Sequence, residues 1–219
     1  STHGAALDRV GAVYVVPPPA SPLGRFGADV LSGAWRPPGY TAEAWSARVA
    51  DPAVYGFHAT IKAPFTPIAP AGVAGVTRRA AGFARGERPV TRAPLRLDAL
   101  AGFAARAVVA FEPSRAPASD ADRAKRGVDR LAPDARDRFE RWGYPYVFEH
   151  FRFHMTLTGA LPDEEREPVR AALEVAFAVR VPREPVDIDA LSLPTQSDRA
   201  RAFEPGVRVM LGSGAITAI

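Results

Sequence analysis

The chain is a series of apolar segments whose spacing predicts helices and strands, most of them ended by proline or glycine. Residues 10–16 are mostly apolar and stop at three prolines, which indicates a first strand. Ser21 and Thr41 each precede a segment with helical spacing, and hydroxyl residues are favoured at helix N-caps. Further helices are predicted at residues 73–86, at residues 120–142 with an interruption near Pro133, and after Asp163, which is predicted to cap the last of them.

The remaining apolar segments have the alternating pattern of strands. Residues 95–99 and 104–111 are predicted to form a hairpin, because a short Ala-Gly step separates them. Residues 186–191 and 207–211 are predicted as the last two strands.

One stretch of the chain occurs twice. Residues 55–65 contain Phe57-His58-Ala59-Thr60-Ile61, and residues 151–159 contain Phe153-His154-Met155-Thr156-Leu157. Both copies have the aromatic, β-branched and aliphatic residues that are typical of strands. Because side chains alternate along a strand, the histidine and threonine of each copy share one face and the apolar residues share the other. The two copies therefore predict a site in which two histidines face each other.

The elements predicted after each copy also repeat, in the order strand, helix, strand, strand. Repeated units of this kind favour an α+β fold with antiparallel sheets over a doubly wound parallel fold. The length of 219 residues fits one domain built of two lobes. We predict a first-motif lobe at roughly residues 40–112 and a second-motif lobe at roughly residues 140–212. The pattern leaves open on which lobe the N-terminal strand and helix pack.

Composition narrows the chemistry of the chain. There is no cysteine, which excludes disulfides, thiolate metal sites and cysteine nucleophiles. The net charge is +4 and the isoelectric point about 9.8, a balance that is compatible with phosphate-bearing ligands but also with ordinary arginine-rich surfaces. No apolar run has the length of a membrane span, and the first residues lack the layout of a signal peptide. We therefore expect a soluble cytoplasmic protein without a membrane partner.

A histidine and a threonine on each of two strands suit phosphodiester chemistry. One imidazole can accept a proton from the attacking water or hydroxyl while the other donates one to the leaving oxygen. The hydroxyls of Thr60 and Thr156 can donate to the non-bridging phosphate oxygens. We therefore predict that His58 and His154 act as an acid–base pair without a metal or other cofactor. A single His-x-Thr triplet would be better explained by a structural histidine, whereas the matched pair favours a function.

Strand alternation adds candidate substrate-binding residues. Lys62 follows Thr60 on the His58 face, and Arg152 precedes His154 on the His154 face, so either cation could meet phosphate charge or reach solvent at a strand end. Tyr14 and Tyr144 could stack on a base or sugar, or pack in the core or at its rim. Arg115, in a loop flanked by prolines, is a candidate for a second phosphate.

The two motifs resemble those of the two-histidine (2H) phosphoesterase superfamily, whose members include LigT-like RNA cyclic phosphodiesterases. Within it, the chain is similar to the bacterial branch encoded with phosphonate-utilisation (carbon–phosphorus lyase) genes. The segments that carry the resemblance are residues 17–23, 55–65, 115–117 and 141–159. The resemblance implies a bilobal fold with pseudo-two-fold symmetry, in which two antiparallel sheets flank a central cleft and helices lie outside.

The resemblance also implies an activity, metal-independent opening of cyclic phosphates on ribose. His58 with Thr60 and His154 with Thr156 match the motifs of the superfamily. The phosphonate branch suggests a small phosphorylated ribose cyclic phosphate as the substrate. Two alternatives stay open: RNA end processing or 2′,5′ ligation, for which the chain lacks an obvious stripe of cations and aromatics, and a non-catalytic phosphate-ligand binder in a phosphonate pathway.

Overall fold

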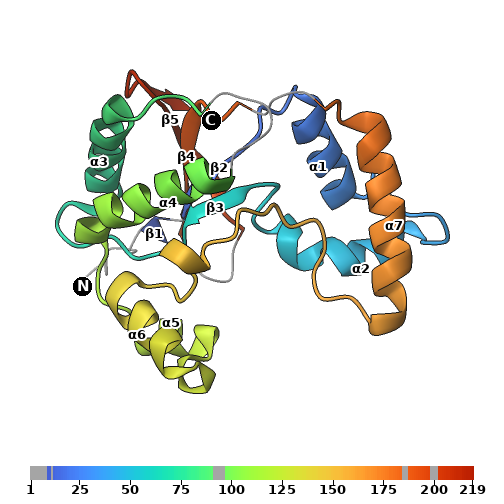
Figure 1. Cartoon of the computed structure of the whole chain (residues 1–219), viewed down its shortest axis with the longest axis horizontal. Helices are drawn as coiled ribbons and strands as arrows, with labels where there is room; N and C mark the ends of the chain where they lie inside the picture. Colours follow the sequence, from blue (N-terminus) through green and yellow to red (C-terminus); the bar gives the residue numbers. More distant parts are fainter. Residues whose placement is uncertain (1–8, 11, 91–96, 184–186, 198–201) are drawn as a thin grey trace, which may run out of the picture. The chain divides into compact units, whose positions relative to one another are not determined.

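The computed structural model describes residues 9–10, 12–90, 97–183, 187–197 and 202–219 (Figure 1). The fold is α+β, as predicted. The chain divides into two compact units, each built from separate stretches of sequence. The sheet unit contains Ser1–Val15, Thr60–Phe153 and Asp187–Ile219, and the helical unit contains Val16–Ala59 and His154–Val186. These bounds differ from the predicted lobes at 40–112 and 140–212, because each unit takes segments from both halves of the chain.

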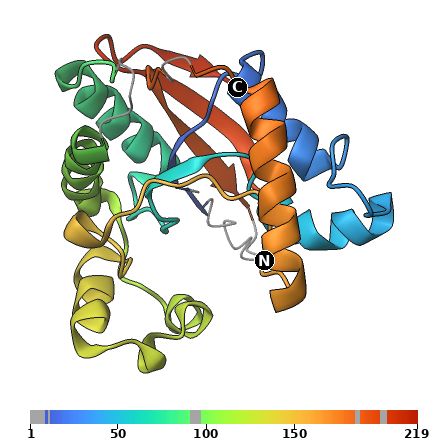
Figure 2. The ribbon, with the colours of Figure 1, turned by 45° about the vertical axis from the view of Figure 1, so that its right-hand side comes forward.

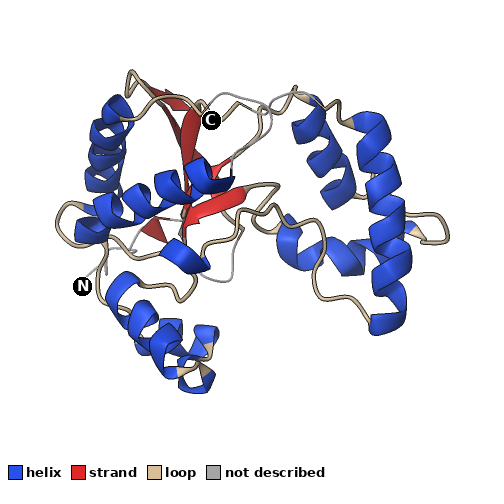
Figure 3. Cartoon of the chain, viewed as in Figure 1, coloured by secondary structure: helices blue, strands red, loops and turns tan. Residues whose placement is uncertain are grey.

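The described strands form one sheet, coloured red in Figure 3. Its order is β3-β2-β4-β5-β6, with β1 paired to β4 off this path. The pairings of β4 with β1, β2 and β5, and of β5 with β6, are antiparallel. The strands are β1 (Arg9–Val10), β2 (Val13–Val15), β3 (Ala59–Lys62), β4 (Ala190–Gln196), β5 (Glu204–Met210) and β6 (Ile216–Ala218). The predicted first and first-motif strands are present. The strand predicted at 207–211 corresponds to β5, but it is not the last, because β6 follows it. Of the strand predicted at 186–191, residues 190–191 belong to β4, and Val186 lies outside the described residues.

Two helices of the sheet unit, α3 (Gly72–Gly86) and α4 (Leu97–Phe111), pack on each other, and α3 lies beside β4 and β5 (Figure 2). The predicted helix at 73–86 is confirmed. The predicted hairpin at 95–99 and 104–111 is wrong, because α4 runs through its supposed turn; Leu95 lies outside the described residues. The buried positions of α4 recur with helical rather than alternating spacing: Leu100, Phe103, Ala104, Ala107, Val108 and Phe111.

The rest of the sheet unit is a run of short helices after α4. The prediction of a helix at 120–142 that is interrupted near Pro133 is confirmed, since α5 and α6 are separate and α6 starts at that proline. Ser119 caps α5 with a capping box, and α6 ends at Gly143 in the left-handed region. These helices are η1 (Glu112–Ser114), α5 (Asp120–Arg126), η2 (Val128–Arg130), α6 (Pro133–Trp142) and η3 (Phe148–His150).

The helical unit consists of α1 (Pro22–Ser32), α2 (Ala42–Ala53) and α7 (Asp163–Arg180). Ser21 and Thr41 cap the first two helices as predicted, each accepting a backbone N–H three residues later. The predicted cap Asp163 is wrong, because Asp163 is the first residue of α7 and Pro162 holds the cap position. The core residues come from all three helices. The buried indole of Trp45 donates to the Val30 carbonyl at 3.0 Å. This core consists of Phe26, Val30, Trp45, Val49, Val169, Ala176 and Val181.

A polar triad joins α2 to α7 in the helical unit. Glu165 accepts hydrogen bonds from Nε and Nη2 of Arg48, at 2.7 and 2.6 Å, and from the Tyr40 hydroxyl at 2.6 Å. The bidentate geometry is the strong form of an arginine–carboxylate pair. Chiefly because Arg48 and then Tyr40 donate to it, the pKa of Glu165 is lowered from 4.5 to about 2.

The triad predicts a pH dependence of stability. Because the folded-state pKa of Glu165 lies below its unfolded value, its contribution is present above about pH 4.5 and is lost as the pH falls toward 2. We expect Glu165→Gln to lower the melting temperature at pH 7, and this deficit to shrink steadily between pH 4.5 and 2. Glu164→Gln, at the exposed neighbouring position of the same helix turn, is the matched control. A deficit that is constant with pH would contradict the prediction.

The predicted duplication does not extend beyond the motifs themselves. The first copy is followed by the helices α3 and α4, whereas the second is followed by α7 and then by the strands β4 and β5. The second motif forms a single bridge, Ala59 to Met155, in place of a full strand. A second sheet is therefore not found among the described residues. None of the described helices has the length and hydropathy needed to cross a membrane.

Candidate functional site

The first motif places His58 immediately before β3 and fixes its ring from the backbone. Gly56 has φ +72°, in the left-handed region that glycine adopts without strain. Its carbonyl lies 2.8 Å from Nδ1 of His58. A carbonyl can only accept, so Nδ1 carries the proton and the neutral imidazole has its lone pair on Nε2. The local turn therefore selects the tautomer that presents Nε2 for proton transfer.

His58 is half-buried, and its pKa is lowered from the ordinary value of 6.5. Burial is the largest cause, because it disfavours the imidazolium, and the charge of His154 lowers the pKa further. Hydrogen bonds to the backbone of Gly56 and Tyr55 oppose these effects. The Tyr55 ring lies 6.5 Å from the imidazole, centroid to centroid. The electrostatic effect of His154 means that the two imidazoles interact.

The second motif is an extended segment with the predicted alternation. Its polar residues are exposed and its apolar residues half-buried: Arg152, His154 and Thr156 against Phe153, Met155 and Leu157. The antiparallel bridge between Ala59 and Met155 joins it to the first motif. In an antiparallel pair the next residues along each chain are also opposite, which puts His58 across from Thr156. One bridge within the helical unit thus joins the two motif copies directly, and the prediction that the two histidines form one site stays a prediction.

Each motif also contacts a helix of the helical unit. The ring of Phe57 packs so closely on α1 that a Cβ added at Gly27 would lie 2.1 Å from it. The N–H of Gly159, which ends the second motif, donates to the Arg48 carbonyl at 2.8 Å. Arg48 is also the arginine of the triad with Glu165, so the same residue joins α7 and the second motif to α2.

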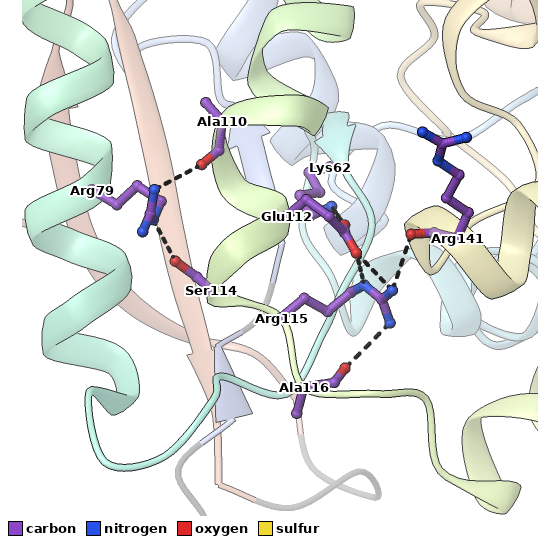
Figure 4. Close-up of polar contacts among 8 residues, drawn as sticks. All are labelled: Lys62, Arg79, Ala110, Glu112, Ser114, Arg115, Ala116 and Arg141. Atoms are coloured by element: carbon purple, nitrogen blue, oxygen red, sulfur yellow. Dashed lines mark hydrogen bonds and ion pairs between the residues drawn. The ribbon is translucent and has the colours of Figure 1, made fainter.

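Lys62 and Arg115 both pair with one carboxylate, that of Glu112. Lys62 is only 3% exposed, and its ammonium lies 2.9 Å from Oε2 of Glu112 (Figure 4). Arg115 donates to Oε1 of the same carboxylate at 2.8 Å and to the carbonyls of Ala116 and Arg141. Burial lowers the pKa of Lys62, and the Glu112 carboxylate opposes this shift. The prediction that Lys62 could reach solvent at a strand end is therefore wrong.

The other predicted substrate-binding residues lie in the sheet unit. Tyr14 is buried and its ring packs 6.2 Å from Phe203, in agreement with the core alternative. Tyr144 lies under the guanidinium of Arg126, 4.7 Å from the ring centroid. Arg152 is exposed, and its Nη1 donates to the carbonyls at 149 and 151. The binding role of these residues remains a prediction.

Sequence reasoning missed the residues that support the motifs. Glu112 lies three residues before Arg115, a spacing at which opposite charges meet on a helical turn, so a local signal existed for that pair. The contacts of Glu165 with Tyr40 and Arg48 span more than a hundred residues, and Gly27 is in α1 whereas Phe57 is in the segment between α2 and β3. Local sequence patterns do not predict such contacts. Among the described residues, no group of three or more His, Asp or Glu side chains could hold a metal ion.

The chain matches one protein-family model. The model is described as "Protein of unknown function (DUF1045)" and matches residues 96–204, which include the second motif but not the first. The chain is 32% identical over 190 residues to "Ribose 1,5-bisphosphate phosphokinase PhnN" of Janthinobacterium sp. (strain Marseille), covering 78% of this chain and 42% of that protein. It is 36% identical over 218 residues to the protein of the same name in Laribacter hongkongensis (strain HLHK9), covering 88% and 49%. The chain thus spans about half the length of these curated relatives. No solved structure matches.

Proposed function

We propose that the chain is a 2H-type cyclic phosphodiesterase that opens a cyclic phosphate on a small ribose phosphate without a metal. The observation that carries the proposal is the pairing of the two His-x-Thr motifs. The bridge between Ala59 and Met155 joins them, and the charge of His154 lowers the pKa of His58. Two imidazoles that interact, with threonine hydroxyls on the same strand faces, supply a base, an acid and donors for the phosphate oxygens.

In the proposed step, a water oxygen forms a bond to phosphorus and one ribose oxygen leaves. Nε2 of His58 accepts the proton of the water, because the Nδ1 tautomer and the lowered pKa keep this nitrogen unprotonated at neutral pH. His154, which is exposed, donates a proton to the ribose oxygen. The hydroxyls of Thr60 and Thr156 donate to the non-bridging oxygens. The products are one phosphomonoester and one free ribose hydroxyl, so the reaction consumes only water.

The names of the relatives favour one substrate and one bond. Opening a 1,2-cyclic phosphate of ribose 5-phosphate at the bond between phosphorus and O2 gives ribose 1,5-bisphosphate, the compound in those names. Opening it at O1 would give the 2,5-bisphosphate instead. We therefore assign cleavage of the bond to O2, in phosphonate metabolism as the resemblance of the sequence suggests. The reaction would supply the substrate for which the relatives are named.

The same names raise a second candidate function, ATP-dependent phosphorylation of ribose 1,5-bisphosphate. A phosphate-binding P-loop requires glycine before its lysine and serine or threonine after it. The lysines of the chain are Lys62, between Ile61 and Ala63, and Lys125, between Ala124 and Arg126, so neither fits this motif. Because the chain spans about half of each relative, we assign the kinase activity to the other half of those proteins.

A set of assays with different substrates separates these functions. The purified chain is incubated in EDTA with the 1,2-cyclic phosphate of ribose 5-phosphate, and the products are identified by ³¹P NMR. We expect turnover to ribose 1,5-bisphosphate only. The 2,5-bisphosphate would contradict the assigned bond, and binding without turnover would favour a non-catalytic ligand binder. Turnover of 2′,3′-cyclic RNA ends in preference to the sugar would favour RNA processing. Phosphorylation of ribose 1,5-bisphosphate with ATP and Mg²⁺ would favour the kinase.

The lowered pKa of His58 predicts a pH profile for this reaction. A base must be unprotonated in the free enzyme, so kcat/KM falls as the pH drops through the pKa of His58. Since this pKa lies below 6.5, we expect the acid limb of the profile to have its midpoint below pH 6.5. Tyr55→Leu removes the ring that lies beside the imidazole and Tyr55→Phe keeps it, so these two variants form a matched pair. An acid limb centred above pH 6.5 in the wild type would contradict the assignment of His58 as the base.

A further inference from the structure

The sheet unit contains a pocket that none of the motifs explains. It lies between α3 and the segment that follows α4, and its volume is about 600 Å³. Pockets of this volume are in the range that binds small molecules. Its lining includes the apolar side chains of Ile68, Val76 and Phe83, and it also includes Arg78 and Arg79. No carboxylate is found among the described residues that line it, so the pocket has an excess of positive charge.

Arg79 is held in place at this pocket before any ligand binds. Its Nε donates to the hydroxyl of Ser114 at 2.7 Å and its Nη1 to the Ala110 carbonyl at 3.3 Å (Figure 4). Ser114 is itself buried, so its hydroxyl is a fixed acceptor. Among the described residues, Nη2 of Arg79 makes no hydrogen bond. A guanidinium that is already ordered loses little entropy when it binds an anion, and two parallel N–H groups match carboxylate, sulfonate or phosphate oxygens.

The glycines of α3 keep the pocket open. Gly75 and Gly82 both line it, and a Cβ added at Gly82 would meet no atom within 4 Å. The absence of side chains there leaves the space beside Phe83 for a ligand. Glycine in the interior of a helix costs about 1 kcal/mol relative to alanine, so this space carries a cost in stability.

We propose that this pocket binds an organic anion, a small molecule with one acidic head and an apolar body. The head would lie against Arg78 and Arg79, and the body against Phe83 and Ile68. A ribose phosphate has no apolar body, so this ligand differs in chemistry from the substrate proposed above. None of the residues that line the pocket belongs to the two motifs, so the proposal does not rest on the proposed phosphodiesterase activity.

The test uses two fluorescent probes that differ only in charge. 1-Anilinonaphthalene-8-sulfonate has a sulfonate on an aromatic body, and N-phenyl-1-naphthylamine is the same body without it. We expect the sulfonate probe to bind the native chain with one saturable site. We expect its Kd to rise about tenfold or more in Arg79→Ala, as for the loss of a hydrogen bond to a charged group. Binding of the uncharged probe should be weaker and should not depend on Arg79.

Gly82→Leu blocks the pocket without a backbone clash and replaces glycine by a better helix former, so the variant is expected to fold. It should abolish saturable binding of both probes. Matched controls on α3 are Ala74→Leu and Arg85→Ala, which are exposed positions that do not line this pocket. Unchanged sulfonate binding in Gly82→Leu or Arg79→Ala would overturn the proposal. Equal loss in the controls, or equal affinity for the uncharged probe, would also overturn it. His58→Ala should bind the sulfonate probe normally, which keeps this test independent of the phosphodiesterase.

Discussion

Replacement of His58 or His154 by alanine is expected to lower cyclic phosphodiesterase kcat/KM by about 10²–10⁴-fold, the contribution typical of a positioned acid or base. Each imidazole carries one proton transfer of the proposed step, so neither variant retains an efficient path. Because the two residues act on the same transition state, the double variant should lose much less than the product of the two single losses. The measurement is single-substrate kinetics with the 1,2-cyclic phosphate of ribose 5-phosphate in EDTA.

His150→Ala is the control for this experiment. His150 is exposed and lies only four residues before His154, but it belongs to the 3₁₀ helix η3 rather than to the motif. We expect its kinetics to match those of the wild type. The melting temperatures of all variants should also be measured, since His58 is half-buried. Full activity in either single motif variant, with an unchanged fold, would sink the acid–base assignment.

Replacement of Glu112 by glutamine is expected to destabilise the folded chain by about 3–5 kcal/mol, the cost of leaving a buried charge without its partner. Lys62 is 3% exposed and its ammonium lies 2.9 Å from the Glu112 carboxylate. The same carboxylate also pairs with Arg115 at 2.7 Å, so the substitution leaves two cations close together. Urea unfolding at pH 7 measures the change in the free energy of unfolding. The double variant Glu112→Gln/Lys62→Met should recover most of the loss, because methionine has no charge to bury.

The loss in Glu112→Gln should depend on pH with a definite sign. Burial lowers the pKa of Lys62, and removal of Glu112 removes the main group that opposes this shift. The unfolded state then binds the proton more tightly than the folded state, so stability rises as the pH increases through the lowered pKa. The deficit is therefore larger at neutral pH than at high pH, and it shrinks as the pH approaches the ordinary lysine value of 10.5.

Glu87→Gln is the matched control for Glu112. It breaks the salt bridge to Arg106 at 2.7 Å, but that guanidinium is 57% exposed, so water replaces the lost partner. We expect a change of about 1 kcal/mol or less. A loss in Glu112→Gln no larger than that in the control, at every pH, would show that Lys62 does not carry a buried charge.

The local patterns of the sequence were sufficient for most of the helices. Ser21 and Thr41 were correct as caps, and the break at Pro133 was correct, because caps and proline act on the nearest turn of the backbone. The hairpin at 95–111 failed for the opposite reason. Its apolar residues fit both an alternating and a helical pattern over a short window, and only packing against α3 decides between them. Because α4 takes the place of this hairpin, the elements after the two motif copies differ, and the predicted duplication does not extend beyond the motifs.

The sequence by itself determined which side chains share a face in each motif, because alternation is a property of the extended backbone. His154 and Thr156 are exposed on one side of their segment and Met155 is not. Only the tertiary structure decided what lies opposite them and what holds them. The bridge from Ala59 to Met155, the ion pair of Lys62 with Glu112 and the packing of Phe57 on Gly27 join residues distant in sequence. Such contacts depend on how whole helices and strands pack, and no short segment of the chain determines that packing.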